Sequence, residues 1–281
     1  MNNLAQTHER RGLVAAGNWI IDRVKMIDTW PAQDALATIG TQSESNGGGP
    51  YNVLKDLAKL QCGFPLAGVG LIGRDADGAK ILQDCDAHGI NRVAIQFTDA
   101  APTSYTDVMT VTGTGRRTFF HQQGANALLD LQHFDFARTS ARIFYLGYMC
   151  LLRRLDLVGS DGRTPASRLF EQAQSLGLTT VADLVSNETS DFAAIIDPSL
   201  AYLDYLFLNE YELARLVGGK ESKSHFELEA QVYVAEVSKR PQFPGDWVAT
   251  GKLREVALPT VMRKIVEHGL DTGGPLFSAQ P

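Results

Sequence analysis

The sequence is poor in the features that mark several classes of protein. Its three cysteines, Cys62, Cys85 and Cys150, are odd in number and widely spaced among apolar residues, which suits neither a disulfide framework nor a zinc site. The 26 Lys and Arg residues are outnumbered by 32 Asp and Glu residues, so no overall positive field draws the chain to nucleic acid or to an anionic membrane. We therefore predict no nucleic-acid partner, and the cysteine usage predicts a reducing cytoplasm.

Long hydrophobic runs are also scarce. The longest, IFYLGYMCLL at residues 143–152, is about half as long as a membrane-spanning helix. The start of the chain places two arginines before the apolar run LVAAG, as a secretory signal does, but Asn18 breaks the run and Asp22 and Arg23 end it. We favour a buried first strand at residues 13–17 over a signal, and predict no membrane segment.

What the sequence does contain is the material for a packed fold. Its 281 residues can bury a substantial core, and 44% hydrophobic with 21% charged residues is ordinary for a globular domain. Strand-like apolar runs alternate with segments of helical period as far as about residue 219, after which the signals weaken. The predicted strands are 13–17, 66–73, 92–97, 104–112, 116–121, 141–147, 178–184 and 202–209, and the predicted helices are 51–60, 77–90, 165–176 and 189–196. This order predicts an α/β fold with a mostly parallel sheet, and the runs 104–112 and 116–121 predict a hairpin that forms a flap or lid.

One candidate binding residue follows the first strand. In GNWIID, the strand ends at Gly17 and Asp22 comes five residues later. Ligands of parallel α/β sheets bind beyond the carboxyl ends of the strands, and a carboxylate there can accept hydrogen bonds from sugar hydroxyls. The alternative is a solvated loop aspartate.

A glycine-rich segment, NGGGPYN, opens the first predicted helix. Gly48 and Gly49 would allow the backbone to come close to a ligand, and Asn52 in the first turn could reach the same ligand. A plain turn with a helix cap would explain the segment equally well. No Gly-Lys-Ser/Thr follows, so this is not a P-loop, and the first strand lacks the G-x-G-x-x-G of a dinucleotide-binding oxidoreductase.

Three further stretches have a chemical and a structural interpretation. LFLNEYE delivers Asn209 and Glu212 to one helical face, where they could orient metal-bound water around phosphates or simply cap the helix. In VGLIGRDADG, Asp75 or Asp77 is predicted to cap the next helix. His121 could be a general base, but a structural histidine is the more common case at a strand end.

In this order and spacing, the pieces resemble the ribokinase-like (PfkB) carbohydrate kinases over about residues 13–219. The elements that carry the resemblance are GNWIID, GGGPYN, VGLIGRDADG, the region of Thr103, HQQGAN, and LNEYE as the N-x-x-E element. The resemblance implies one doubly wound domain over residues 1–281, with a mostly parallel sheet flanked by helices and a small β lid from segments near 18–45 and 98–123. It also implies ATP-dependent phosphorylation of a hydroxyl of a sugar or related polyol, with ATP and Mg²⁺.

The resemblance assigns roles to individual residues. Asp22 and Asn52, with the backbone of Gly48 and Gly49, would hold the hydroxyls of a small-molecule sugar or polyol. Asn209 and Glu212 would place the phosphates and Mg²⁺, with Glu212 as the metal residue and Asp183 nearby. The family also suggests a possible homodimer formed through the lid.

The chain departs from the family at its C-terminal motif, D-T-x-G-A-G-D, which supplies the anion hole and the catalytic base. DTGGPLF aligns Asp271, Thr272 and Gly274 with the motif but puts Phe277 where the base belongs. Phe277 cannot accept a proton, so we identify no catalytic residue and interpret residues 220–281 as divergent or truncated. We expect very weak or absent phosphorylation. The alternatives are a non-catalytic sugar-binding or regulatory protein, and a truncated or frame-shifted kinase product.

Overall fold

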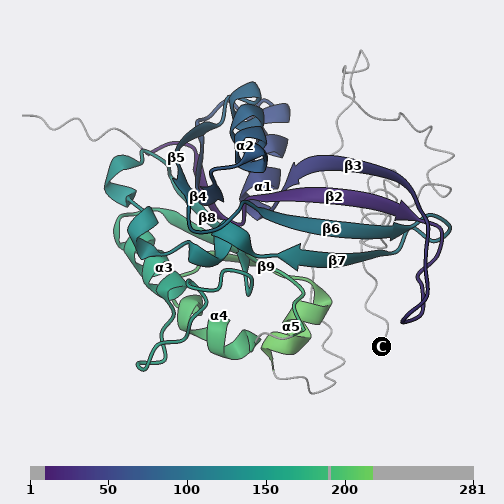
Figure 1. The fold of residues 1–281 in the computed structure, drawn as a ribbon. Helices are drawn as coiled ribbons and strands as arrows, with labels where there is room; N and C mark the ends of the chain where they lie inside the picture. The colour runs from purple at the N-terminus through teal and green to yellow at the C-terminus, as the bar shows by residue number, and fades with distance from the viewer. Residues whose placement is uncertain (1–9, 189–190, 218–281) are drawn as a thin grey trace, which may run out of the picture. The chain divides into compact units, whose positions relative to one another are not determined.

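A parallel six-stranded sheet forms the centre of the fold (Figure 1). The computed structural model describes residues 10–188 and 191–217, all of which belong to one compact unit of the chain. The strand order is β10-β9-β8-β1-β4-β5, and every neighbouring pair is parallel. The strands are β1 (Leu13–Gly17), β4 (Leu66–Gly73), β5 (Asn91–Thr98), β8 (Ile143–Met149), β9 (Thr179–Leu184) and β10 (Tyr205–Phe207).

Helices cover both faces of this sheet because its central strands are apolar on both sides. In β1, Leu13 and Ala15 pack into one hydrophobic cluster with helices α1 and α2, whereas Val14 and Ala16 pack into a second cluster with α3 and α4. The helices are α1 (Gly49–Lys59), α2 (Ala76–Ala87), α3 (Pro165–Ser175), α4 (Phe192–Leu200) and α5 (Glu210–Leu216). The predicted α/β class with a mostly parallel sheet flanked by helices is confirmed, and the first apolar run is the buried strand β1.

A second sheet of four strands projects beside the first (Figure 1). Its order is β3-β2-β6-β7; β2 and β6 are parallel, and the outer pairs are antiparallel. The strands are β2 (Ile20–Ile27), β3 (Ile39–Gly47), β6 (Ser104–Val111) and β7 (Arg117–Gln122). We call this sheet the lid; whether it closes over a ligand stays a prediction.

Two sequence interpretations differ from the structure in detail. The alternative of a solvated loop aspartate is wrong for Asp22, which lies in β2, inside the segment 18–45 expected to contribute to the lid. The chain turns within two residues of β1 and starts this lid strand, whose first residues, Ile20 and Ile21, are buried. Helix α4, expected near residues 189–196, runs from Phe192 to Leu200, and the carboxylate of Asp191 caps it by accepting a hydrogen bond from the amide of Ala194.

The joint between the two sheets depends on a buried side chain from the HQQGAN segment. Asn126 donates from its amide to the carbonyl of Trp19 (3.0 Å) and accepts from the amide of Trp19 (3.3 Å). Trp19 is fully buried and donates from its indole to the carbonyl of Val69 in β4. These bonds satisfy the backbone where the chain passes from β1 to β2, and so fix the direction in which the lid leaves the main sheet.

The VGLIGRDADG segment has a structural role at the start of α2. Asp75, rather than Asp77, is the cap of α2: its carboxylate accepts from the amide of Gly78 (2.8 Å) and from the hydroxyl of Thr103 (2.6 Å). The VGLIGRDADG segment thereby ties α2 to the start of β6. No helix within residues 10–188 and 191–217 is long and apolar enough to cross a membrane.

Candidate functional site

The glycines that open α1 are required by close backbone packing. Gly48 has φ 93°, and a Cβ there would lie 1.8 Å from the carbonyl oxygen of Asn18. A Cβ on Gly49 would lie 2.8 Å from the hydroxyl of Tyr145. Only glycine fits at position 48, and a side chain at position 49 would displace the hydroxyl of Tyr145. The start of α1, a helix with Asn52 in its first turn, therefore comes close to the carboxyl ends of β1 and β8.

Asp22 brings a partly buried carboxyl from the lid to this segment. A Cβ on Gly47, the residue before Gly48, would lie 2.0 Å from the Oδ2 of Asp22. Burial raises the pKa of Asp22 from its ordinary value of 3.8 to about 6, and the positive charge of Arg117 opposes this rise. The carboxyl is therefore poorly solvated and close to the glycines, as a group that binds ligand hydroxyls would be.

Tyr148, at the end of β8, is the residue around which the predicted polar groups gather. Burial raises the pKa of its phenol; the charges of Asp183, Asp22 and Glu212 raise it further, and the side chain of Asn52 lowers it by a hydrogen bond. Asn52 of α1 thus contacts the phenol, while the carboxylates of the lid, β9 and α5 act on it through their charge. The sequence interpretation missed Tyr148, although its place just after the predicted parallel strand 141–147 was a usable signal.

Asp183 lies at the carboxyl end of β9 and is held by a tyrosine. The hydroxyl of Tyr145 donates to its Oδ2 over 3.0 Å. Burial raises the pKa of Asp183 to about 6; the bond from Tyr145 lowers it, and the charge of Glu212 raises it. A carboxyl in this state is partly protonated just below neutral pH and could exchange a proton with a ligand.

Asn209 and Glu212 form a helix cap, which was the alternative to a phosphate site in the sequence interpretation. They make a complete capping box at the start of α5, in which Glu212 accepts from the amide of Asn209 (2.8 Å) and Asn209 accepts from the amide of Glu212 (2.9 Å). The other oxygen of Glu212 accepts from Ser186 (2.8 Å), and the residue is only 4% exposed. Its carboxylate is committed to the protein on both oxygens.

The described residues do not form a ready site for Mg²⁺. Residues 10–188 and 191–217 contain no group of three His, Cys, Asp or Glu side chains that could hold a metal ion. Glu212, the predicted metal residue, has both oxygens engaged. Direct ligation by Glu212 is therefore not what this geometry supports. Thr272, Gly274 and Phe277 lie outside the described residues.

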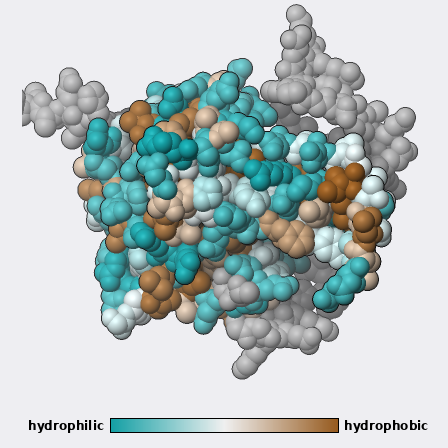
Figure 2. Space-filling view, viewed as in Figure 1, coloured by the Kyte–Doolittle hydropathy of each residue, from teal (hydrophilic) through white to brown (hydrophobic). Residues whose placement is uncertain are grey.

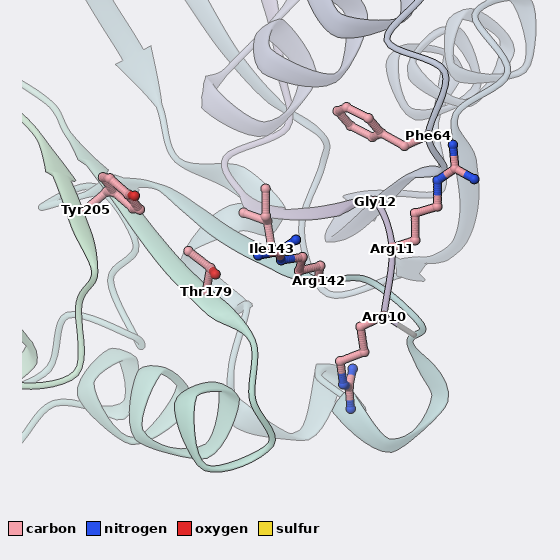
Figure 3. Close-up of a pocket in the computed structure, with 8 residues that line it drawn as sticks. All are labelled: Arg10, Arg11, Gly12, Phe64, Arg142, Ile143, Thr179 and Tyr205. Atoms are coloured by element: carbon pink, nitrogen blue, oxygen red, sulfur yellow. The ribbon is translucent and has the colours of Figure 1, made fainter. Parts of the chain in front are cut away.

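A pocket of about 750 Å³ lies at the other edge of the main sheet (Figure 3). It is lined where β1, β8, β9 and β10 begin, by Arg10, Arg11, Gly12, Phe64, Arg142, Ile143, Thr179 and Tyr205. The residues that gather around Tyr148 lie where parallel strands end. The pocket and the candidate site are therefore at opposite edges of the sheet, and the pocket contains none of the predicted site residues.

Comparison with known proteins places this geometry in a family. Residues 12–239 match the family described as pfkB family carbohydrate kinase. A curated relative, the ATP-dependent ribose-1-phosphate kinase of Halopiger xanaduensis, is 25% identical over 207 residues, which are 73% of this chain and 64% of the relative. The chain thus spans a little under two thirds of that protein.

Solved structures share the fold at low identity. The ribokinase of Giardia lamblia aligns with a TM-score of 0.59 and 20% identity, over 74% of this chain and 60% of that one. The ribokinase of Arabidopsis thaliana, solved with ribose and ATP, aligns with a TM-score of 0.57 and 24% identity, over 74% and 63%. With its central sheet, its lid and its family match over most of its length, the chain belongs to the pfkB family of carbohydrate kinases.

Proposed function

We propose that this domain binds a sugar or related polyol between the lid and the start of α1, and that the reaction of its site is ATP-dependent phosphorylation of one hydroxyl. The observation that carries the proposal is that two carboxyls lie at the glycine segment before Asn52. Asp22 lies against Gly47, and Asp183 accepts from the hydroxyl of Tyr145, on which Gly49 packs. Carboxylates accept from hydroxyls and an amide does both, so this set suits a ligand with several hydroxyls. The glycine amides beside it add donors.

Phosphoryl transfer depends mainly on positioning and on neutralising the charge of the phosphates. Among the described residues, Asp22, Asn52 and the glycine segment would position the polyol. ATP as co-substrate comes from the family, and Mg²⁺ would be held chiefly by the phosphates and water, with Glu212 as an ordered carboxylate behind the amide of Asn209. Phe277 at the expected base position predicts slow or absent turnover in this chain.

Calorimetry with a panel of pentoses, hexoses, nucleosides and sugar alcohols tests the binding half of the proposal. We expect at least one to bind wild-type protein and to bind at least tenfold more weakly to Asn52→Ala. Binding of none, under conditions where the protein is folded, contradicts the proposal. The transfer half is tested with the best ligand and labelled ATP: rapid product formation by pure protein would contradict the expected slow turnover.

A second candidate function is a sugar-responsive protein without catalysis. The observation that favours it is Phe277 in the place of the base, together with the structural commitment of Glu212. It predicts that a polyol raises the unfolding temperature equally with and without ATP. A polyol effect that needs ATP and Mg²⁺ together would favour the kinase instead.

We also propose that two copies of the chain associate through their lids. The lid exposes large apolar side chains, among them Ile39, Phe119 and Phe120, and Trp30 is stacked on Phe120 with ring centroids 6.1 Å apart. Figure 2 shows hydrophobic surface over the end of the lid. Light scattering that gives a monomer at all accessible concentrations would refute association. A reducing cytoplasm stays a prediction from the cysteines.

A further inference from the structure

His121, in lid strand β7, has a buried nitrogen without a partner. Its Nδ1 is 2.9 Å from the hydroxyl of Thr106 in β6. Its Nε2 is buried and makes no hydrogen bond to any described residue. Leaving a buried polar atom unpaired costs about 1–3 kcal/mol, so this nitrogen calls for a partner, and a ligand, a water molecule or an ion can supply it.

The strand register places His121 in line with Asp22. Asp22 pairs with Thr106 across β2 and β6, and Thr106 pairs with His121 across β6 and β7. Directly paired residues of neighbouring strands point to the same face of a sheet. The three side chains therefore form one row across the lid, on the face that carries the carboxyl of Asp22.

The candidate site lies on that face. The carboxyl of Asp22 lies against Gly47 at the start of the glycine segment, and its charge acts on the phenol of Tyr148. Neighbouring strands are about 4.8 Å apart, so β2 and β7 are separated by about 10 Å. A ligand bound to Asp22 could reach His121 only if it has a second polar group towards the β7 side of the row.

The chemistry of His121 indicates what that group is. Burial lowers the pKa of the imidazole, and a hydrogen bond to the backbone of Tyr105 opposes this only in part, which leaves the ring neutral at pH 7. A neutral ring whose Nδ1 is engaged by Thr106 has one nitrogen left, which can donate or accept a single hydrogen bond according to the tautomer. That suits a hydroxyl, and it supplies no charge to balance a phosphate.

We propose that His121 is a specificity-determining residue whose Nε2 hydrogen-bonds one hydroxyl of the polyol, while Asp22 binds another. The inference rests on the proposed polyol-binding function and narrows its substrate class. The ligand carries hydroxyls at both ends of the row, and its end near β7 is uncharged. The hydroxyl of Thr106, at hydrogen-bond distance from Nδ1, orients the imidazole ring of His121.

The test compares deoxy analogues in the wild-type protein and in two variants. His121→Asn keeps a polar group near the Nδ1 position, where it can meet Thr106, and lacks Nε2. His121→Phe keeps the shape of the ring and lacks both nitrogens. His88→Asn is the matched control, because His88 lies at the end of α2 and bonds the carbonyl of Asp84 there.

Binding of the best polyol and of its monodeoxy analogues is measured by calorimetry. Wild type and His88→Asn are expected to bind one analogue about tenfold more weakly than the parent. In His121→Asn and His121→Phe that discrimination should disappear, because the parent binds as weakly as the analogue. Either variant that folds gives the answer, as judged by its thermal unfolding.

Two results would overturn the inference, and they can be told apart. If the variants discriminate among the analogues as wild type does, His121 does not contact the ligand, while polyol binding stands. If wild type binds no polyol, the proposed function fails and the role of His121 fails with it.

Discussion

Replacing Asp22 by Asn should stabilise the protein at neutral pH while it weakens polyol binding. Burial raises the pKa of Asp22 from its ordinary value of 3.8 to about 6. The unfolded chain ionises this carboxyl more easily than the folded one, so at pH 7 and above the folded state bears the full cost of a buried charge. An amide of the same shape carries no charge and avoids that cost.

The size of the effect follows from the two pKa values. At about 1.4 kcal/mol for each pH unit, the interval from 3.8 to about 6 corresponds to about 3 kcal/mol. The carboxyl is partly open to solvent, which screens it, so we reduce this by about half, to about 1–2 kcal/mol. The stability that Asp22 contributes is present below pH 3.8 and is lost as the pH rises through about 6. The advantage of Asp22→Asn should therefore be largest at pH 8 and shrink towards pH 4.

Urea unfolding of wild type and Asp22→Asn at pH 4.5, 6 and 8 measures this difference. Asp34→Asn is the control, because Asp34 is exposed in the connection between β2 and β3 and asparagine tolerates its φ of 64°. The reasoning is refuted if Asp22→Asn is less stable than wild type at pH 8, or if its advantage does not change with pH. A parallel loss of polyol affinity would show that the site keeps an unstable charge for binding.

Three further substitutions test other parts of the site. Gly48→Ala should lower the free energy of unfolding by about 2–4 kcal/mol and abolish polyol binding, because the added Cβ would lie 1.8 Å from the carbonyl oxygen of Asn18. Urea unfolding measures the loss, and an unchanged midpoint would show that the glycine segment is not constrained. Tyr145→Phe removes the hydrogen bond that lowers the pKa of Asp183, so carboxyl NMR should show that pKa above its wild-type value. Asn209→Ala should lose about 1 kcal/mol of stability with the cap of α5 and leave polyol binding within twofold, whereas a large loss of binding would show that Asn209 contacts the ligand.

The main sheet could be predicted from the sequence because its central strands are short, continuous apolar runs. LVAAG and LAGVGLIG form β1 and β4, which are apolar on both faces, and parallel strands under two layers of helices must be so. The lid strand β3 could not be found in this way. IGTQSESNG is almost entirely exposed, and it is extended because its backbone pairs with β2 over its whole length, which leaves no hydrophobic pattern.

The site was predictable where one residue could be tied to a strand end or a helix start. Asn52 and Asp183 lie where the strand and helix pattern put them. The roles of Tyr148 and His121 depend on neighbours that are distant in the chain. The surroundings of Tyr148 come from four different elements, and the place of His121 in the row depends on the register of three lid strands. Single-sequence patterns contain the period of each strand but not the alignment between strands.

The charges of the candidate site affect the binding of a nucleotide and of a polyol differently. Asp22, Asp183 and Glu212 all act on the phenol of Tyr148, and the positive charge of Arg117 offsets the burial of Asp22 only in part. A triphosphate that approached these carboxylates without cations would be repelled, so Mg²⁺ should strengthen nucleotide binding. A neutral polyol has no such requirement. Polyol binding should therefore be measurable without nucleotide, and nucleotide binding should depend on Mg²⁺ more steeply than polyol binding does.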